Sequence, residues 1–358
     1  MVNSYFTLRA LVREWAPDLR GCTVGDVFSQ VRNELTIAFA HPEQAWMVRA
    51  SVQRPLLFMF RTEGYSKARR NVATLFRPVF EREVLDVRIA ERDRMIFWDL
   101  EGDLRMQLVL FGSRANAYLV DAEGQIVEAF RNNDKHAGTE APTPRPAPVP
   151  ETFADFEDRW RTNRNKTRQA IQSAVPLFGQ TLARETIHRA GVTTAAPEDC
   201  TAADRRALFD AAQALIRELD DPAPCLYQSG RFPELFALRP MGHRDDPAET
   251  FDTVDDGVSV FVRRTLAQQH FQRLYEPLED ALTEARDHYR QSAERMLDEL
   301  ANESRADRYE RWGHLLMAQH HDLRKGADEV ALPDMFKDGE SITIPLDPAK
   351  SPVENAQH

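Results

Sequence analysis

Residues 84–130, VLDVRIAERDRMIFWDLEGDLRMQLVLFGSRANAYLVDAEGQIVEAF, contain short apolar runs separated by charged and glycine-containing segments. Two of these segments, Glu101-Gly102-Asp103 and Ala122-Glu123-Gly124, have the composition of tight turns. Because tight turns join antiparallel strands, this stretch predicts an antiparallel sheet or sandwich and not a parallel βαβ fold. The predicted strands are Val84–Ala90, Met95–Leu100, Met106–Leu110, Ala117–Val120 and Ile126–Phe130.

The residues before this stretch extend the pattern to an α+β domain, an α/β sandwich over residues 1–137. An amphipathic helix opens the chain, and Pro17 and Gly21 are expected to end it. A second helical stretch is predicted near Asn71–Arg82. Further strands are predicted at Cys22–Gln30, Leu35–Phe39 and Ala45–Ser51.

The residues after this stretch change in composition. Residues 138–150, GTEAPTPRPAPVP, are rich in proline and predict a semi-rigid linker. Residues 151–250 predict a small helical domain, in which Val175–Gly179 is a tight turn between two helices, a helix-hairpin-helix. Its predicted elements are helices at Asn163–Ala174, Thr181–Ala190 and Ala202–Glu218, and short strands at Cys225–Gln228 and Glu234–Leu238.

The last third of the chain predicts a coiled-coil arm over residues 251–330. Its apolar residues recur at spacings of four, three and four, which is the pattern of a heptad seam. Asn302–Asp307 has turn composition, and a second apolar stripe, Tyr309 to Leu323, follows it in a second helix. Residues 331–358 contain Asp338-Gly339, a hairpin dipeptide, and are expected to begin a second arm. The seam is formed by Leu274, Leu278, Ala281 and Ala285.

The composition limits what the protein can bind. The chain has 358 residues and a net charge of −11, from 57 acidic and 46 basic residues. An acidic chain is not coated with nucleic acid over its whole surface, because phosphate binding needs Lys and Arg, but it can carry a local basic face. No apolar stretch approaches the ~18–20 residues of a membrane span, and no secretory signal is visible, so we expect a cytoplasmic location and no membrane partner.

The chain shows no signature of a metal, cofactor or nucleophile site. No C-x-x-C, H-E-x-x-H, G-x-G-x-x-G, P-loop or G-x-S-x-G motif is present, and His314, His320 and His321 have the wrong spacing for a zinc helix. The Cys residues at 22, 200 and 225 are expected to be reduced thiols. We therefore expect a protein without catalytic activity, metal or cofactor.

Two turns are candidates for contact with a nucleic acid. Asp93-Arg94 lies between two predicted strands, where Arg94 can contact a phosphate or a base edge while Asp93 orients it. The turn Gly112-Ser113-Arg114-Ala115-Asn116 contains two residues that tolerate positive φ, Gly112 and Asn116, and its backbone amides can bind an anion. The alternative for both is an ordinary charged β-turn.

Two basic runs and one helical turn are weaker candidates. Clustered arginine beside an aromatic residue such as Trp160 is typical of an RNA backbone site, although a solvated helix face is an equal alternative. The turn at Val175–Gly179 exposes amides at a helix N-terminus, but it has one glycine where good phosphate binders often have two. The residues of the two runs are Lys67, Arg69, Arg70 and Arg77, which lead into the predicted helix near Asn71–Arg82, and Arg161, Arg164 and Lys166.

Taken together, several segments resemble the NFACT family, which includes the fibronectin-binding protein A-like proteins, bacterial RqcH and eukaryotic NEMF. The resemblance covers essentially the whole chain, and its most specific part is the closing string SPVENAQ at 351–357. The matching segments are Tyr5–Glu14, Asp93-Arg94, Gly112–Asn116, Arg311–Leu316, Lys325-Gly326, Ile344–Pro348 and Ser351–Gln357.

The resemblance implies an N-terminal domain related in fold to formamidopyrimidine-DNA glycosylase, then a helix-hairpin-helix domain and a coiled-coil middle region. Family members continue into a second coiled-coil arm and an RNA-binding domain, so this sequence is expected to be truncated before that domain and its apolar seam to self-associate. Val2 and Asn3 replace the N-terminal Pro and Glu that the glycosylases use, so we expect no base excision.

The resemblance also implies a role in ribosome-associated quality control. Family members bind a large ribosomal subunit obstructed by peptidyl-tRNA and recruit tRNA, and the nascent chain is then extended without mRNA. In bacteria the added tail is alanine, so an alanine tRNA is the expected partner. The alternative is an adhesin that binds fibronectin in the extracellular matrix, against which the missing secretion signal argues.

The family implicates the Asp-Arg pair and the glycine-containing turn in tRNA binding. By position, these roles pass to the tRNA-binding candidates Asp93, Arg94, Gly112, Ser113, Arg114 and Asn116. The turn departs from the family pattern, because Ser113 and Arg114 stand where Arg and His are common.

Overall fold

The computed structural model describes residues 2–42, 44–301, 304–337 and 339–358. The chain forms two compact units, residues 1–270 and residues 271–358. In the described residues, the first unit contains two five-stranded sheets, a three-stranded sheet and the helices that pack with them, and the second contains helices and a hairpin. All candidate site residues lie in the first unit.

The first sheet is antiparallel and packs with the opening helix. α1 (Tyr5–Leu19) begins at Ser4, whose hydroxyl accepts the N–H of Thr7. We expected Pro17 to help end this helix, but it lies inside the last turn. A proline there removes only one hydrogen bond, so the helix continues to Leu19. The sheet has the order β4-β3-β2-β1-β5. Its strands are β1 (Thr23–Val31), β2 (Glu34–Ala40), β3 (Ala45–Ser51), β4 (Phe58–Glu63) and β5 (Ala73–Thr74).

The second sheet confirms the five strands predicted over residues 84–130. It is antiparallel with the order β10-β9-β8-β7-β6. Gly102 and Gly124 have φ values of 78° and 80° in its turns, a backbone conformation that glycine adopts without a steric cost. Inward side chains of both sheets share one core, so the domain is a sandwich. The strands are β6 (Val84–Ile89), β7 (Met95–Leu100), β8 (Leu104–Val109), β9 (Asn116–Val120) and β10 (Ile126–Ala129).

The predicted helix near Asn71–Arg82 is wrong. Apart from β5, the segment contains only a single 3₁₀ turn, η1 (Arg77–Val79). Phe76 is buried in a left-handed conformation with φ of 49°, and its N–H donates to the Glu128 carboxylate at 2.9 Å. Tertiary packing of Phe76 therefore overrides the local helical pattern, and the first basic run does not lie along a helix.

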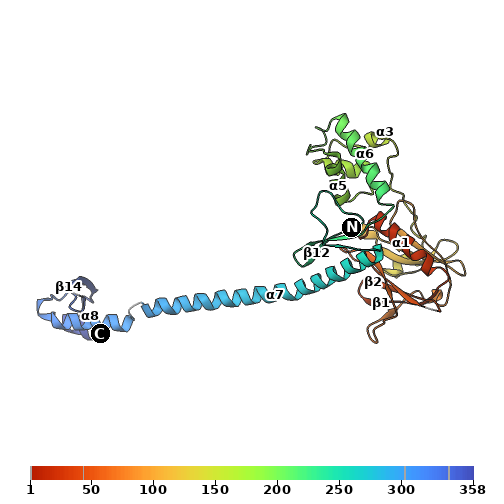
Figure 1. The fold of residues 1–358 in the computed structure, drawn as a ribbon. Helices are drawn as coiled ribbons and strands as arrows, with labels where there is room; N and C mark the ends of the chain where they lie inside the picture. Colours follow the sequence, from red (N-terminus) through yellow and green to blue (C-terminus); the bar gives the residue numbers. More distant parts are fainter. Residues whose placement is uncertain (1, 43, 302–303, 338) are drawn as a thin grey trace. The chain divides into compact units, whose positions relative to one another are not determined.

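The helical part of the first unit confirms the predicted helix–turn–helix. Among its helices, α3, α5 and α6 lie together (green tones in Figure 1). Thr152 and Thr201 each form a capping box with the Asp three residues later, which fixes where α3 and α6 begin. The elements are α2 (Asn133–His136), α3 (Phe153–Arg159), α4 (Thr167–Ala174), α5 (Gln180–Ala190), α6 (Ala202–Glu218), and a sheet of β11 (Cys225–Ser229), β12 (Phe232–Ala237) and β13 (Glu249–Thr250).

The long helix α7 (Val254–Ala301) is tied at its start to α1. The Glu14 carboxylate accepts the N–H of Val254 at 2.7 Å and that of Asp255 at 3.0 Å, so a side chain from the first helix caps α7. Asp255 in turn pairs with Arg61 of β4. Burial raises the pKa of both Glu14 and Asp255, against the hydrogen bonds that lower it.

The second unit only partly confirms the predicted arm. The seam residues Leu274 and Leu278 lie on α7 and are exposed. In place of a second long helix, α8 (Arg305–Ala318) packs its apolar stripe against a hairpin, because Leu315 and Leu316 share a core with Leu332 and Ile344. Of the predicted turns, Asn302, Glu303 and Asp338 lie outside the described residues. The remaining elements are η3 (His320–Asp322), β14 (Glu329–Pro333), β15 (Ser341–Pro345) and α9 (Pro352–Gln357).

Candidate functional site

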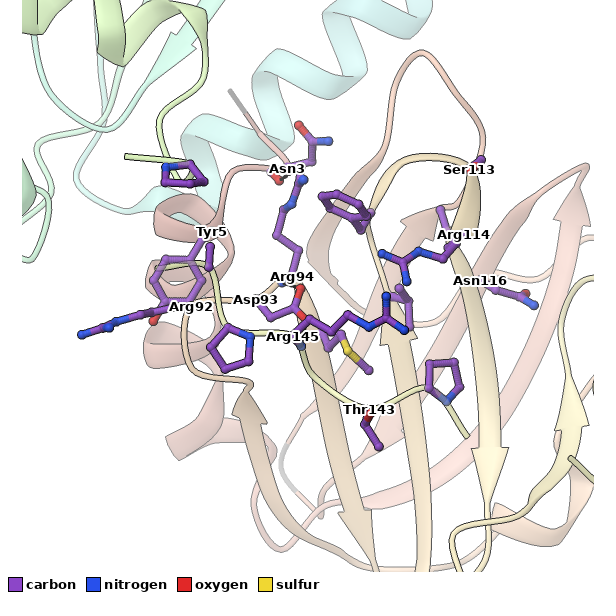
Figure 2. A pocket seen from close by; sticks show the side chains of 18 of the residues that line it. Asn3, Tyr5, Arg92, Asp93, Arg94, Ser113, Arg114, Asn116, Thr143 and Arg145 are labelled. Carbon is purple, nitrogen blue, oxygen red and sulfur yellow. Dashed lines mark hydrogen bonds between the residues drawn. The ribbon is translucent and has the colours of Figure 1, made fainter. Parts of the chain in front are cut away.

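A pocket of about 930 Å³ brings together segments that are far apart in the sequence. It lies at one end of the second sheet, and Figure 2 shows the side chains that line it. Its walls come from the N-terminus, the β6–β7 corner, the β8–β9 turn, the Pro-rich segment and the turn before α5. The lining includes Asn3, Tyr5, Asp93, Arg94, Phe111, Arg114, Arg145, Pro176 and Gly179.

The Asp93 carboxylate accepts hydrogen bonds from backbone N–H groups. This differs from the prediction that Asp93 orients the side chain of Arg94. One carboxylate oxygen accepts the N–H of Arg94 at 2.7 Å. The other accepts the N–H of Arg145 at 2.7 Å. Arg92 precedes it with a φ of 52°, which makes the corner sharp. Asp93 therefore fixes the backbone of the corner and of the Pro-rich segment together.

Arg94 lines the pocket and is half-buried. Its guanidinium lies 4.4 Å from the centre of the Phe111 ring, and its Nη1 donates to the Asn3 carbonyl oxygen at 3.5 Å. Burial lowers the pKa of Arg94, while the charge of Asp93 raises it. Since an arginine keeps its proton in proteins, Arg94 is a cation beside an aromatic ring.

The β8–β9 turn is a 3₁₀ turn, η2 (Gly112–Arg114), in which Gly112 has a φ of 53° as its type allows. Arg114 is exposed, and its guanidinium lies 5.3 Å from the Phe111 ring. Phe111 is 42% exposed, and the guanidinium groups of both Arg94 and Arg114 lie over its ring. Phe111 directly precedes the predicted turn and was not predicted to be a site residue.

Asn116 does not adopt the positive φ that its residue type tolerates. Asn116 begins β9 and is buried, and its side-chain oxygen accepts the N–H groups of Ala117 and Arg131. Its side-chain nitrogen donates to the Arg131 carbonyl oxygen at 3.0 Å. Asn116 thus joins β9 to Arg131, and both ends of its side-chain amide are hydrogen-bonded to the backbone.

Two further arginines of the pocket were missed. Arg131 donates from Nη1 to the carbonyl oxygens of Val52 and Ala115, and so supports the wall. Arg145 is exposed on the Pro-rich segment, and its side chain points toward that of Arg114 in Figure 2. The signal for Arg145 was a basic residue between two prolines, but the segment had been interpreted only as a linker.

The two basic runs lie outside this pocket. Lys67 forms an ion pair with Asp26 at 2.6 Å, and its partner therefore already offsets its charge. Trp160 is buried and its Nε1 donates to the Pro197 carbonyl oxygen, so it offers no face for a base to stack on. The other members of the two runs are exposed: Arg69, Arg70, Arg77, Arg161, Arg164 and Lys166.

The turn between α4 and α5 opens on the same pocket as the Asp93 corner. Pro176 to Gly179 form part of its wall, and the buried Phe178 meets Phe6 of α1 with ring centres 6.2 Å apart. Gly179 precedes α5 without a side-chain hydrogen bond at the cap. The helix-hairpin-helix turn is thereby held against the sandwich by aromatic packing.

Metal-binding clusters and membrane-spanning helices also bear on function. Among the described residues, no cluster of three His, Cys, Asp or Glu side chains could hold a metal ion. None of the helices in the described part of the chain is both long and apolar enough to cross a membrane.

The chain is similar to proteins of known structure at low sequence identity. The fibrinogen binding protein from Staphylococcus aureus is 15% identical, with a TM-score of 0.59 over 73% of this chain and 99% of that one. The N-terminal part of the fibronectin/fibrinogen-binding protein from Streptococcus suis is 12% identical, with a TM-score of 0.53 over 72% of this chain and 98% of that one. These similarities confirm the α+β fold.

The comparisons by sequence give the family. No curated protein sequence matches the chain. A family model described as NFACT N-terminal and middle domains matches residues 4–358. Since this match spans nearly all of the sequence, the chain belongs to the NFACT family.

Proposed function

We propose that the pocket binds tRNA, and that the protein acts by binding, without catalysis, in ribosome-associated quality control. In this role it engages a large ribosomal subunit obstructed by peptidyl-tRNA and recruits tRNA, with alanine tRNA expected, for tailing of the nascent chain without mRNA. Membership of the NFACT family supports the proposal. The observation that carries it is the pair of arginines, Arg94 and Arg114, next to the exposed Phe111.

The chemistry of this cluster suits an RNA loop. A guanidinium presents a planar fork of donors that matches phosphate oxygens, and it also stacks on bases. An exposed aromatic ring accepts an unpaired base, which single-stranded RNA offers and a duplex does not. The chain concentrates Arg94, Arg114 and Arg145 here although its net charge is −11.

We expect tRNA binding to weaken as salt rises. If three arginines each neutralise one phosphate, the slope of log K against log salt is about −2, and affinity falls roughly 20-fold between about 50 and 200 mM salt. Fluorescence anisotropy with labelled alanine tRNA measures this, with DNA duplex of equal length as the comparison. An affinity that does not change over this range would contradict an electrostatic site.

The role on the ribosome needs its own test. Tagged full-length protein is sedimented through a sucrose gradient of lysate, and the RNA that co-purifies is sequenced. Co-migration with large ribosomal subunits and enrichment of alanine tRNA are the expected results. Migration as free protein without tRNA would contradict the proposal.

A second candidate function rests on the names of the structural relatives. Both are described as binding fibrinogen or fibronectin, and they share the fold at 15% and 12% identity. Binding of the protein to immobilised fibronectin and fibrinogen tests this function directly. Saturable binding that survives in variants of Arg94 would favour an adhesin that uses another surface.

A further inference from the structure

The Pro-rich segment reaches the pocket through a regular pattern of hydrogen-bond donors. Proline occupies every second position from 142 to 150, so only residues 143, 145, 147 and 149 retain a backbone N–H. Two of these donors are bound to the β6–β7 corner: Arg145 donates to the Asp93 carboxylate at 2.7 Å, and Ala147 donates to the Arg92 carbonyl oxygen at 2.9 Å. The segment is therefore pinned beside the pocket.

The prolines on both sides of Arg145 restrict its own backbone. A residue before proline is confined to extended conformations, and Pro144 fixes its own φ. Gln107 of β8 adds a further contact, because its Nε2 donates to the Pro142 carbonyl oxygen at 2.7 Å. Arg145 thus leaves a rigid, anchored backbone, and its side chain has a defined starting point.

The side chains of Arg145 and Arg114 converge, and in the described part of the chain neither guanidinium is paired with a carboxylate. Figure 2 shows the two side chains pointing toward each other from different segments, while the Arg92 side chain points away. Among the residues that the structure describes, neither Arg114 nor Arg145 forms an ion pair. Two converging cations repel each other, and an anion bound between them removes that repulsion.

We propose that Arg114 and Arg145 form a phosphate subsite of the pocket, and that Asp93 is a positioning residue that holds Arg145 there without touching the RNA. This inference rests on the proposed tRNA binding. It adds Arg145 to the site and separates the residues that contact phosphate from the residue that positions them. Both carboxylate oxygens of Asp93 are taken by the N–H groups of Arg94 and Arg145.

The direction in which Asp93→Asn changes RNA affinity distinguishes a positioning role from a purely electrostatic one. Asp93→Asn removes a negative charge from an anion site, so electrostatics alone would strengthen RNA binding. The positioning role requires the opposite. An asparagine has a single acceptor oxygen for the two N–H groups, so the Arg94 and Arg145 amides compete for it and the hold on Arg145 weakens.

The test compares Asp93→Asn, Arg145→Ala and the double variant by anisotropy with labelled alanine tRNA. We expect each single variant to weaken binding about 10-fold, and the double variant to be within about twofold of Arg145→Ala, because Asp93 acts through Arg145. Arg145→Ala lowers the salt slope by about one, and Arg145→Lys restores part of the affinity. Arg206→Ala, which removes one exposed arginine of α6 outside the pocket, is the matched control.

Two readouts without tRNA keep the inference separate from the proposed function. Hydrogen exchange of the Arg145 amide is expected to be faster in Asp93→Asn, whereas an unchanged rate would overturn the positioning role. Inorganic tripolyphosphate, titrated calorimetrically, is expected to bind the wild type and not Arg145→Ala. If it does so while tRNA does not bind, the subsite stands and the tRNA function fails.

In the anisotropy experiment, two results would overturn the inference. One is that Asp93→Asn binds tRNA as tightly as wild type, and the other is that the losses add in the double variant.

Discussion

Arg94→Ala is expected to weaken tRNA binding by roughly 30–100-fold, which corresponds to about 2–3 kcal/mol for one charge-assisted hydrogen bond. The loss is large because the Arg94 guanidinium is half-buried, so its charge acts where water screens it less than at an open surface. The change also removes the cation from one side of Phe111, which lies 4.4 Å away. Anisotropy with labelled tRNA measures the effect, and circular dichroism checks the fold.

Arg94→Lys is the informative companion. It keeps the charge but loses the planar fork and the stacking on Phe111, so its affinity is expected between those of wild type and Arg94→Ala. Arg206→Ala, outside the pocket, should change binding less than twofold. If Arg94→Ala binds tRNA within twofold of wild type, the pocket is not the tRNA site.

Glu185→Ala is expected to destabilise the first unit by about 3–5 kcal/mol, the range for removing one partner from a buried charge cluster. Glu185 on α5 is 1% exposed, and Arg189 donates to it at 2.7 Å. The N–H groups of Gly242 and His243 also donate to its carboxylate, and the His243 ring lies 2.6 Å from it. Urea unfolding measures the change, with the half-exposed Glu218→Ala as the control expected to cost far less.

The same residue gives a pH dependence with a definite sign. Burial raises the pKa of Glu185, but the hydrogen bonds from His243, Arg189 and the two amides outweigh it and hold the pKa at about 2, below its ordinary 4.5. The stabilisation is therefore complete above pH 4.5 and is lost as pH falls toward 2, by about 3 kcal/mol in all. Glu185→Gln should lack this loss. Equal slopes for wild type and variant between pH 5 and 2 would contradict the assignment.

Local pattern predicted the five strands of the second sheet, three strands of the first sheet and the Asp93 corner, because alternation and turn glycines act over a few residues. It did not predict β4 and β5. It failed where distant contacts decide the outcome. Phe76 lies in a core that also contains the second sheet, and this burial prevents the helix predicted around it. Arg145 joins the site through a hydrogen bond to a residue 52 positions earlier, which no local pattern in a Pro-rich segment indicates.

Residue type also misled at two positions. Asn116 was selected because asparagine tolerates positive φ, yet its amide both donates to and accepts from the backbone of Arg131. Trp160 was expected to accompany a basic run as a stacking surface, but its ring is needed in the core beside Phe156. In both cases a polar or aromatic group serves packing that only the folded chain reveals.

The hydrogen bonds between Glu14 and the start of α7 limit how early the first unit can finish folding during translation. Glu14 and Asp255 are 241 residues apart, and the helix that contains Glu14 is made first. At roughly 5–20 residues per second, a ribosome needs about 12–50 s to travel from one to the other. During that interval the Glu14 carboxylate lacks the Val254 and Asp255 N–H groups that it accepts in the folded unit. The contact between α1 and α7 can therefore form only after residue 255 has been translated, however early the rest of the first unit folds.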